Sequence, residues 1–306
     1  MKRFFKTLVN FVATIMLVVA CLSFAGCGED ITTVSLNLNL YDYSDGEYYE
    51  AEDVEMSIDF YGHLAPKTVE KMLSYVKDGY YDGALLYRIE GYKQIMMGDL
   101  VLSGGATEIV TGEDGSTNIV QNDIKPQLDG EFEAGGTVGS DLVNSKGYVG
   151  LWRTWKKVGS NNSGNNKFNV SGGLNTGRAT WYMPTATDST YNGFFCVFGV
   201  MDMDDESTTE AFAAIEDIFA TQKNYTQYVI YFTGEYDENK VDQNHGLTYH
   251  CVTKEYFDSL SGDQVEALGI FQAEIGQLEC YNQYTIQVAN NANGSCGAMI
   301  KSAKIA

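Results

Sequence analysis

The sequence predicts a mainly β fold, a small closed β-barrel with helices covering its ends. Two runs, 34–40 and 54–60, alternate apolar with polar residues, which is typical of half-buried strands. The chain has 32 glycines but only 3 prolines, a composition that favours turn-rich β structure over proline-rich linkers. The predicted elements also follow an order that suits a capped barrel: hairpin, helix, strands, long loops, strands, helix and final strand.

The size of the chain allows one large hydrophobic core and a smaller appendage. It has 306 residues, of which 44% are hydrophobic and 13% aromatic. Its formal net charge is −21 at pH 7. Because so acidic a protein is repelled by phosphate backbones, we expect no nucleic-acid partner.

The first residues are typical of a bacterial lipoprotein signal. Basic side chains within the first six positions precede an apolar stretch at 8–25, and the tetrapeptide FAGC follows at 24–27. This pattern predicts a signal peptide over 1–26 and a lipid on Cys27. Lipidation of Cys21 and an uncleaved membrane anchor are the alternatives. In each case we expect the body of the protein to be extracytoplasmic and anchored to the bacterial cell membrane.

The first elements of the body are a hairpin and a helix. Asp45-Gly46, a common hairpin turn, joins the alternating runs at 34–40 and 54–60. Pro66 begins a helix whose apolar positions are spaced i, i+3, i+4 and i+7, and Gly79 ends it. This segment is therefore predicted to be an amphipathic helix packed on the sheet.

The middle of the chain alternates strands with loops. Short apolar segments predict strands at 84–89, 95–97, 147–152, 180–183 and 194–200. Glycine-rich and polar stretches predict surface loops at 103–117 and 156–177.

The last third of the chain predicts two capped helices and three more strands. Ser207 and Glu210 have the spacing of a capping box, which predicts a helix through Phe219. Ser261 and Gln264 have the same spacing and predict a later helix. Strands are predicted at 228–233, 247–252 and 298–305.

The cysteines of the body show no metal-binding spacing. Cys196 lies in an apolar strand and is predicted to be a core residue. Cys251, Cys280 and Cys296 leave open which pair, if any, forms a disulfide, and none belongs to a CxxC motif, so we expect no metal site.

A series of short motifs resembles the cyclophilin-type peptidyl-prolyl cis-trans isomerases. Those of the first half are APKTV at 65–69, GYYDG at 79–83, YRI at 87–89 and GD at 98–99. Those of the second half are IK at 124–125, GEF at 130–132, GYVGLWR at 147–153, TWYMPT at 180–185, NG at 192–193 and VFG at 197–199. Each motif is short, but their joint order and spacing carry the resemblance over about 33–221 and the final strand.

The resemblance implies an eight-stranded barrel and a division of the chain into five parts. The parts are a signal at 1–26, a tether at 27–32, a cyclophilin-like domain at 33–221, a small α+β insertion at 222–296 and the closing strand at 297–306. The insertion is extra to the family pattern. We expect it to lie outside the barrel.

Arg88 falls on the catalytic arginine of the family. Amide resonance makes X–Pro isomerisation slow, with a barrier of roughly 18–20 kcal/mol. A guanidinium that hydrogen-bonds the prolyl nitrogen holds its lone pair out of resonance and lowers this barrier. The chemistry requires no cofactor and no metal, so none is expected.

The resemblance also assigns a substrate-binding pocket. Its expected members are Tyr92, Met96, Trp152, Thr180, Tyr182, Tyr191 and Phe195. Three of them depart from the family pattern: Met96 and Thr180 each replace a glutamine, and Phe195 replaces a histidine. The pocket stays aromatic but loses side-chain hydrogen bonds that would orient the arginine and the substrate.

Two functions follow from this resemblance. The first is a membrane-anchored prolyl isomerase that acts on proline-containing segments of secreted proteins. The alternative is a surface lipoprotein of the same fold that binds peptides or a protein partner and catalyses weakly or not at all, because Met96, Thr180 and Phe195 depart from the family pattern.

Overall fold

The computed structural model describes ten segments of the chain. They are residues 30–42, 49–50, 54–132, 142–153, 156–160, 166–169, 175–187, 192–272, 283–290 and 297–306. The predicted signal peptide with Cys27, the Asp45-Gly46 turn and Tyr191 lie outside the described residues.

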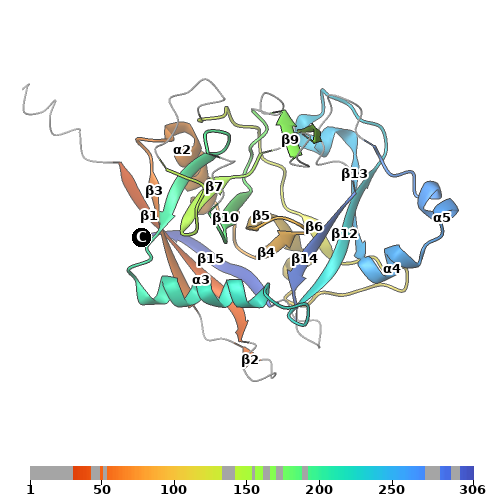
Figure 1. Cartoon of the computed structure of the whole chain (residues 1–306), viewed down its shortest axis with the longest axis horizontal. Helices are drawn as coiled ribbons and strands as arrows, with labels where there is room; N and C mark the ends of the chain where they lie inside the picture. Colours follow the sequence, from red (N-terminus) through yellow and green to blue (C-terminus); the bar gives the residue numbers. More distant parts are fainter. Residues whose placement is uncertain are drawn as a thin grey trace, which may run out of the picture.

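Eight antiparallel strands close into a barrel, as the sequence predicts (Figure 1). The ring runs β4-β15-β1-β3-β11-β7-β10-β5, and β5 pairs back to β4. Its strands are β1 (Ile31–Asp42), β3 (Val54–Tyr61), β4 (Ala84–Ile89), β5 (Gln94–Leu102), β7 (Tyr148–Leu151), β10 (Trp181–Pro184), β11 (Cys196–Met201) and β15 (Ala298–Ile305). The short strands β2 (Tyr49–Glu50) and β6 (Ile119–Gln121) extend β1 and β5.

Alternation of apolar residues explains which face of each strand is inside. In β1 the side chains of Val34, Leu36 and Leu38 are at most 1% exposed, and their neighbours in sequence are not buried. The barrel interior is filled by aromatic rings in edge-to-face contact. The centroid of Phe60 lies 5.2 Å from that of Trp181 and 4.9 Å from that of Phe198.

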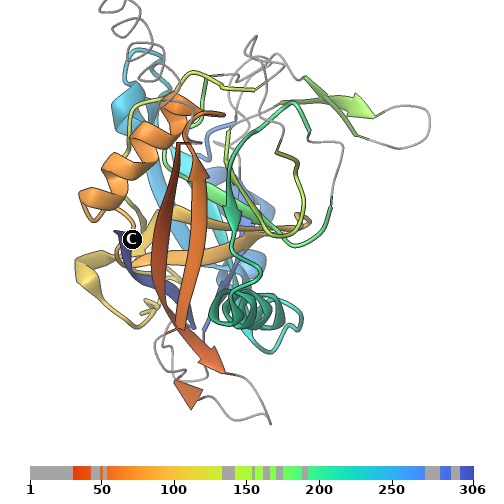
Figure 2. The same cartoon turned by 90° about the vertical axis from the view of Figure 1, so that its left-hand side faces the viewer.

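Two helices lie near opposite ends of the barrel strands (Figures 1 and 2). Helix α2 (Pro66–Lys77) begins at its proline, and Gly79 follows it with φ of 69°, as the sequence predicts. Helix α3 (Glu206–Ile218) begins earlier than predicted. Its N-cap is Asp205, which accepts from the Thr208 backbone at 2.8 Å, whereas Ser207 donates to the Glu55 carbonyl.

The insertion continues the sheet outward from the barrel strand β4. The order is β4-β14-β12-β13, formed by β14 (Tyr284–Ala289), β12 (Tyr225–Thr233) and β13 (Thr248–Thr253). In Figure 1 these strands and helices α4 (Lys254–Ser259) and α5 (Gly262–Ala267) fill the right-hand side. The small α+β insertion is therefore confirmed, but the sequence did not predict β14.

A second hydrophobic core joins the insertion to the outside of the barrel. The outward side chains of β4 and β5, including Leu85, Tyr87 and Met96, pack with Tyr228, Phe232 and others of the insertion. This core is separate from the one inside the barrel. The insertion lies outside the ring of strands, yet it is packed against it.

Of the two predicted surface loops, one contains strands and the other does not. The expected loop at 156–177 contains a two-stranded sheet of β8 (Lys156–Ser160) and β9 (Asn166–Asn169). The expected loop at 103–117 contains one 3₁₀ turn, η2 (Ser103–Gly105), and no strand. Within the described segments, no helix combines the length and the apolar character needed to cross a membrane.

Candidate functional site

A cavity of about 250 Å³ lies between the barrel wall and the insertion. The barrel side contributes Tyr87, Asp99, Trp152 and Thr180, together with residues of the connecting loops. The insertion contributes Phe232, Asn244 and Tyr284. Polar and aromatic side chains thus meet in one concave site, which is the usual form of a ligand pocket.

The inner wall is built by β4 and β5. Tyr87 and Ile89 of β4 both line the cavity, because alternate residues of a strand point to the same face. The Tyr87 hydroxyl donates to Asp99 of β5, at 3.0 and 2.9 Å from its two carboxylate oxygens. Gly98 precedes this aspartate with φ of 109°, and a Cβ there would lie 2.8 Å from the Ala179 carbonyl oxygen. The predicted Gly-Asp motif is therefore a close backbone contact followed by a carboxylate in the cavity wall.

The environment of Asp99 favours its protonated form. Burial raises the pKa of the Asp99 carboxyl from its ordinary 3.8 to about 6, although hydrogen bonds from Tyr87 and Thr180 act in the opposite direction. Burial likewise raises the pKa of Tyr87 well above its ordinary value, and the adjacent Asp99 adds to that effect. Tyr87 therefore remains a hydrogen-bond donor to Asp99 at every physiological pH.

Trp152 is the centre of the aromatic part of the wall. Its ring centroid lies 5.9 Å from that of Tyr92, 6.0 Å from that of Tyr182 and 5.6 Å from that of Phe195. The Tyr182 ring fits over Gly150, where a Cβ would lie 2.4 Å from the ring, and its hydroxyl donates to Asn144. Glycine at position 150 is what allows the tyrosine to lie flat on the neighbouring strand.

The structure brings six of the predicted pocket residues together. Tyr92, Trp152 and Thr180 line the cavity. Met96, Tyr182 and Phe195 are buried in the second core directly behind it, at most 5% exposed. These three support the wall and do not form its surface.

The structure does not bring Arg88 to this cavity. Its two neighbours in β4, Tyr87 and Ile89, line the cavity, so Arg88 points to the other face of the strand. There its Nε donates to the Gln287 side-chain oxygen of β14 at 2.6 Å. The guanidinium also lies 5.7 Å from the ring centroid of Phe219 and 5.8 Å from that of Tyr225. The catalytic assignment of Arg88 stays a prediction from the resemblance.

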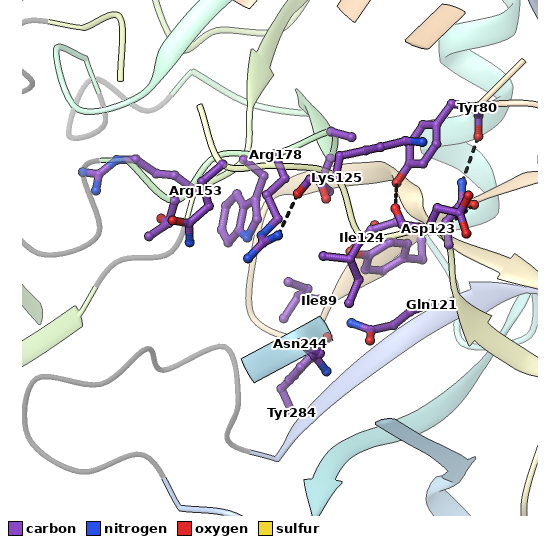
Figure 3. Close-up of a pocket in the computed structure, with 18 of the residues that line it drawn as sticks. Tyr80, Ile89, Gln121, Asp123, Ile124, Lys125, Arg153, Arg178, Asn244 and Tyr284 are labelled. Atoms are coloured by element: carbon purple, nitrogen blue, oxygen red, sulfur yellow. Dashed lines mark hydrogen bonds between the residues drawn. The ribbon is translucent and has the colours of Figure 1, made fainter. Parts of the chain in front are cut away.

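Three other cations reach the cavity wall. Arg178 donates to the Lys125 carbonyl at 2.7 Å, and the Lys125 ammonium lies 4.6 Å from the ring centroid of Tyr80. Arg153 is 3% exposed, donates from Nε to the Phe194 carbonyl and lies over the Phe195 ring. Burial lowers the pKa of Arg153 to about 10, which still leaves it charged at neutral pH. In Figure 3 the Arg178 side chain turns toward the centre of the site, whereas the Arg153 guanidinium points away from it.

Sequence reasoning missed Arg178 and the three insertion residues. Arg178 stands two positions before Thr180, just outside the TWYMPT motif that resembles the family pattern. Phe232, Asn244 and Tyr284 belong to an insertion that has no counterpart in the motifs, so no spacing marked them. An arginine placed next to a predicted strand of pocket residues was the one available signal.

The thiols and carboxylates of the described part form no metal centre. No three His, Cys, Asp or Glu side chains gather there as potential ligands. Cys196 and Cys251 are buried free thiols, and burial raises the pKa of Cys251 to about 11. Cys280 and Cys296 lie outside the described residues.

One family model matches more than half of the chain. The sequence profile of the family described as cyclophilin type peptidyl-prolyl cis-trans isomerase/CLD matches residues 48–233. A solved structure of a cyclophilin type peptidyl-prolyl cis-trans isomerase from Cryptosporidium parvum aligns at 13% identity with a TM-score of 0.37, over 73% of this chain and 94% of that one. A second structure of that protein, in the presence of the dipeptide Ala-Pro, aligns at 15% identity with a TM-score of 0.34, over 72% of this chain and 95% of that one. No curated protein matches the sequence.

Proposed function

Because the chain belongs to the cyclophilin-type peptidyl-prolyl cis-trans isomerase family, we propose that it isomerises X–Pro bonds in extracytoplasmic proteins while anchored through a lipid on Cys27. The observation that carries the proposal is the cavity beside Trp152. It joins an aromatic wall, suited to a proline ring, to hydrogen-bonding groups suited to the flanking peptide.

Each part of the wall has a task in this proposal. Tyr92 and Trp152 hold the proline ring on an apolar surface that excludes water from the reacting amide. Thr180 and Asp99 hydrogen-bond the main chain on either side of the proline. A guanidinium then stabilises the twisted amide, whose nitrogen lone pair is no longer shared with the carbonyl, more strongly than the planar one.

Two arginines compete for this last task. The resemblance assigns it to Arg88, which would have to leave Gln287 to reach the substrate. The geometry of the cavity favours Arg178, which lines it. The exchange rate of a capped Ala-Ala-Pro-Phe peptide, measured by NMR with wild type, Arg88→Ala and Arg178→Ala, decides between them.

Replacing the arginine that acts on the amide with alanine should lower the catalysed isomerisation rate roughly 10²- to 10³-fold, as the loss of other positioned donors does. Its lysine variant should recover little, because an ammonium lacks the planar fork of a guanidinium. A wild-type protein that exchanges the peptide no faster than buffer would contradict the isomerase proposal. Equal activity of wild type and both alanine variants would contradict a guanidinium mechanism.

A second function is favoured by the contacts of Arg88. Its guanidinium is held by Gln287 and two aromatic rings, and Met96 offers no amide to orient it. In this alternative the protein binds proline-containing segments or a protein partner without accelerating isomerisation. Saturable binding of the same peptide together with an unchanged exchange rate is the result that would select it.

A further inference from the structure

The insertion forms one side of the cavity. Phe232 of β12, Tyr284 of β14 and Asn244 of the 3₁₀ segment η5 (Val241–Gly246) all line it. Figure 3 shows Asn244 and Tyr284 on the side of the site away from Arg178 and Lys125. A bound peptide would therefore touch the insertion as well as the barrel. Of these three residues, Asn244 carries the only side-chain amide.

Asn244 is held in an unusual backbone conformation. Asn244 and His245 both have φ of 55°, and they are the two non-glycine residues with positive φ in the described part of the chain. Such a conformation is disfavoured for residues with a Cβ and persists only where the surroundings impose it. Here His245 N–H donates to the Lys240 carbonyl at 2.8 Å, and the Asp237 N–H donates to the His245 carbonyl at 2.7 Å.

Further contacts fix the same turn. The His245 ring stacks on Tyr236 with centroids 4.8 Å apart, and the Leu247 N–H donates to the Asn244 carbonyl at 3.0 Å. The carbonyl of Asn244 is thus hydrogen-bonded within the turn, and the contacts of its neighbours hold the turn at the cavity wall. Asn244 is the residue of this turn that lines the cavity, and its side chain ends in an amide.

This amide has an unmet hydrogen-bonding capacity. The Asn244 side chain is 7% exposed, and its Nδ2 is buried without a hydrogen-bond partner among the described residues. A buried donor left unpaired destabilises the folded protein, so it is rarely found without a functional reason. A half-turn about the last side-chain bond exchanges the nitrogen and the oxygen, so either end of the amide is available to a ligand.

The chemistry of the Asn244 side chain suits a neutral peptide group. Asn244 lines the cavity together with the aromatic residues Phe232 and Tyr284 of the insertion, and no carboxylate among the described residues of the insertion lines the cavity. An amide has one donor group and one acceptor group, which complement the C=O and N–H of a peptide main chain.

We propose that Asn244 is a specificity-determining residue that hydrogen-bonds a main-chain amide of the bound peptide, so that the insertion, and not the barrel alone, selects the substrate. This inference rests on the proposed peptide-binding function of the cavity. It assigns the insertion a role in recognition next to the proline, where the barrel supplies the aromatic wall.

The test compares two variants of Asn244 with a matched backbone control. Asn244→Gly removes the amide and suits the positive φ, since glycine adopts it freely. Asn244→Asp keeps the size and the acceptor oxygen but removes the donor. His245→Gly makes the same backbone change at the adjacent residue of equal φ, without removing a cavity group. Binding of a capped Ala-Ala-Pro-Phe peptide is measured by calorimetry for each, after a thermal melt shows that the variant is folded.

We expect Asn244→Gly to raise Kd roughly 3- to 10-fold, as the loss of one neutral hydrogen bond does, and His245→Gly to raise it less. A rise in Asn244→Asp as well identifies the Nδ2 donor as the contact, and an unchanged Asn244→Asp identifies the oxygen. Peptides with a single N-methylated or ester-replaced amide then identify the main-chain group that Asn244 contacts. The peptide that lacks this group should bind wild type and Asn244→Gly with the same Kd.

Two failures are distinguishable. One failure concerns Asn244 alone. It occurs if wild type binds the peptide and both Asn244 variants bind it as tightly as wild type does, or if His245→Gly raises Kd as much as Asn244→Gly does. The proposed role of Asn244 is then wrong, while peptide binding stands. If wild type binds no proline-containing peptide, the proposed function fails and this inference fails with it.

Discussion

Asp99 shows how one buried carboxyl gives the candidate site a pH dependence. Its pKa is raised by burial to about 6 from an ordinary 3.8, so between these values the folded protein keeps a proton that the unfolded chain releases. The stability that Asp99 contributes is therefore fully present below about pH 4 and is lost as pH rises through about 6. Tyr87 is a donor on both sides of this range.

Asp99→Asn should remove this pH dependence. Asparagine still accepts from the Tyr87 hydroxyl but does not ionise, so the variant should gain stability relative to wild type as the pH rises from about 4 to about 7. The gain should be at most about 3 kcal/mol, since one pKa unit corresponds to about 1.4 kcal/mol. Urea unfolding of both proteins at the two pH values measures it. A stability difference that is the same at both would contradict the raised pKa.

Gly150 tests the packing behind the aromatic wall. Gly150→Ala should destabilise the protein by about 1–3 kcal/mol, the usual cost of overpacking, because the new Cβ would lie 2.4 Å from the Tyr182 ring. Gly262→Ala is the matched control, since no atom lies within 4 Å of a Cβ at that helical position and alanine favours helix. Thermal unfolding compares the two. Equal melting temperatures for both variants would show that Tyr182 does not need the glycine.

At the level of single residues, the sequence located the wall of the site but not the direction of every side chain. Trp152, Tyr182 and Phe195 do meet, because their motifs lie on strands that pair in the barrel. For Arg88 the motif correctly predicted its strand, β4. Only the structure shows that its side chain lies on the face of β4 away from the cavity. A strand's inward face depends on its partners, and β14, the partner that receives Arg88, was not predicted.

Among the elements, the ends of α3 show the limit of local sequence signals. Ser207 and Glu210 have the capping-box spacing, but Asp205 provides the cap and Ser207 donates to the Glu55 carbonyl instead. Two candidate caps two residues apart are equivalent in sequence. The contact with Glu55, which is distant in the chain, decides between them. By contrast, α5 has the predicted capping box of Ser261 and Gln264, because no tertiary contact competes for it.

The insertion is the element that sequence reasoning described least well. Its strands β12 and β13 were predicted. The strand β14 was missed, although its segment, YTIQVA, alternates apolar with polar residues from Tyr284 to Val288. Nothing in the sequence indicated that β14 would pair with β4 through Ile286 and Ile89. Only the structure shows that the insertion covers the outer face of the barrel at the cavity.

Replacing residues 222–296 with a short linker should therefore destabilise the barrel strongly. The change would expose Leu85, Tyr87 and Met96, which are at most 2% exposed, to water. Each such side chain contributes about 1.5–3 kcal/mol when buried, and their sum approaches the whole stability of a typical domain. We expect a loss of cooperative thermal unfolding. A shortened protein that melts cooperatively near the wild-type temperature would show that the barrel is independent of its insertion.

At the scale of the whole molecule, the proposed anchor and the acidic charge act together. A protein of net charge −21 is repelled by anionic lipids, so its surface charge opposes membrane association, and the proposed lipid on Cys27 would have to supply the attachment. Cys27→Ser should then move the protein from the membrane fraction to the soluble fraction or leave its signal uncleaved. Detergent-phase partitioning measures the change, and Cys21→Ser is the control. An unchanged distribution in Cys27→Ser with a changed one in Cys21→Ser would assign the lipid to Cys21.

The pairing of β1 with β15 has a consequence for the order of folding. Val34 pairs with Ile305, so the seam of the barrel joins strands separated by almost the full length of the described chain. Closing so large a loop is entropically costly, and folds dominated by such distant contacts fold slowly. Until β15 arrives, β1 and β4 present open edges to other chains. A polypeptide with this topology can reach its native state only after its last strand is available, so folding is a late and vulnerable event in its life.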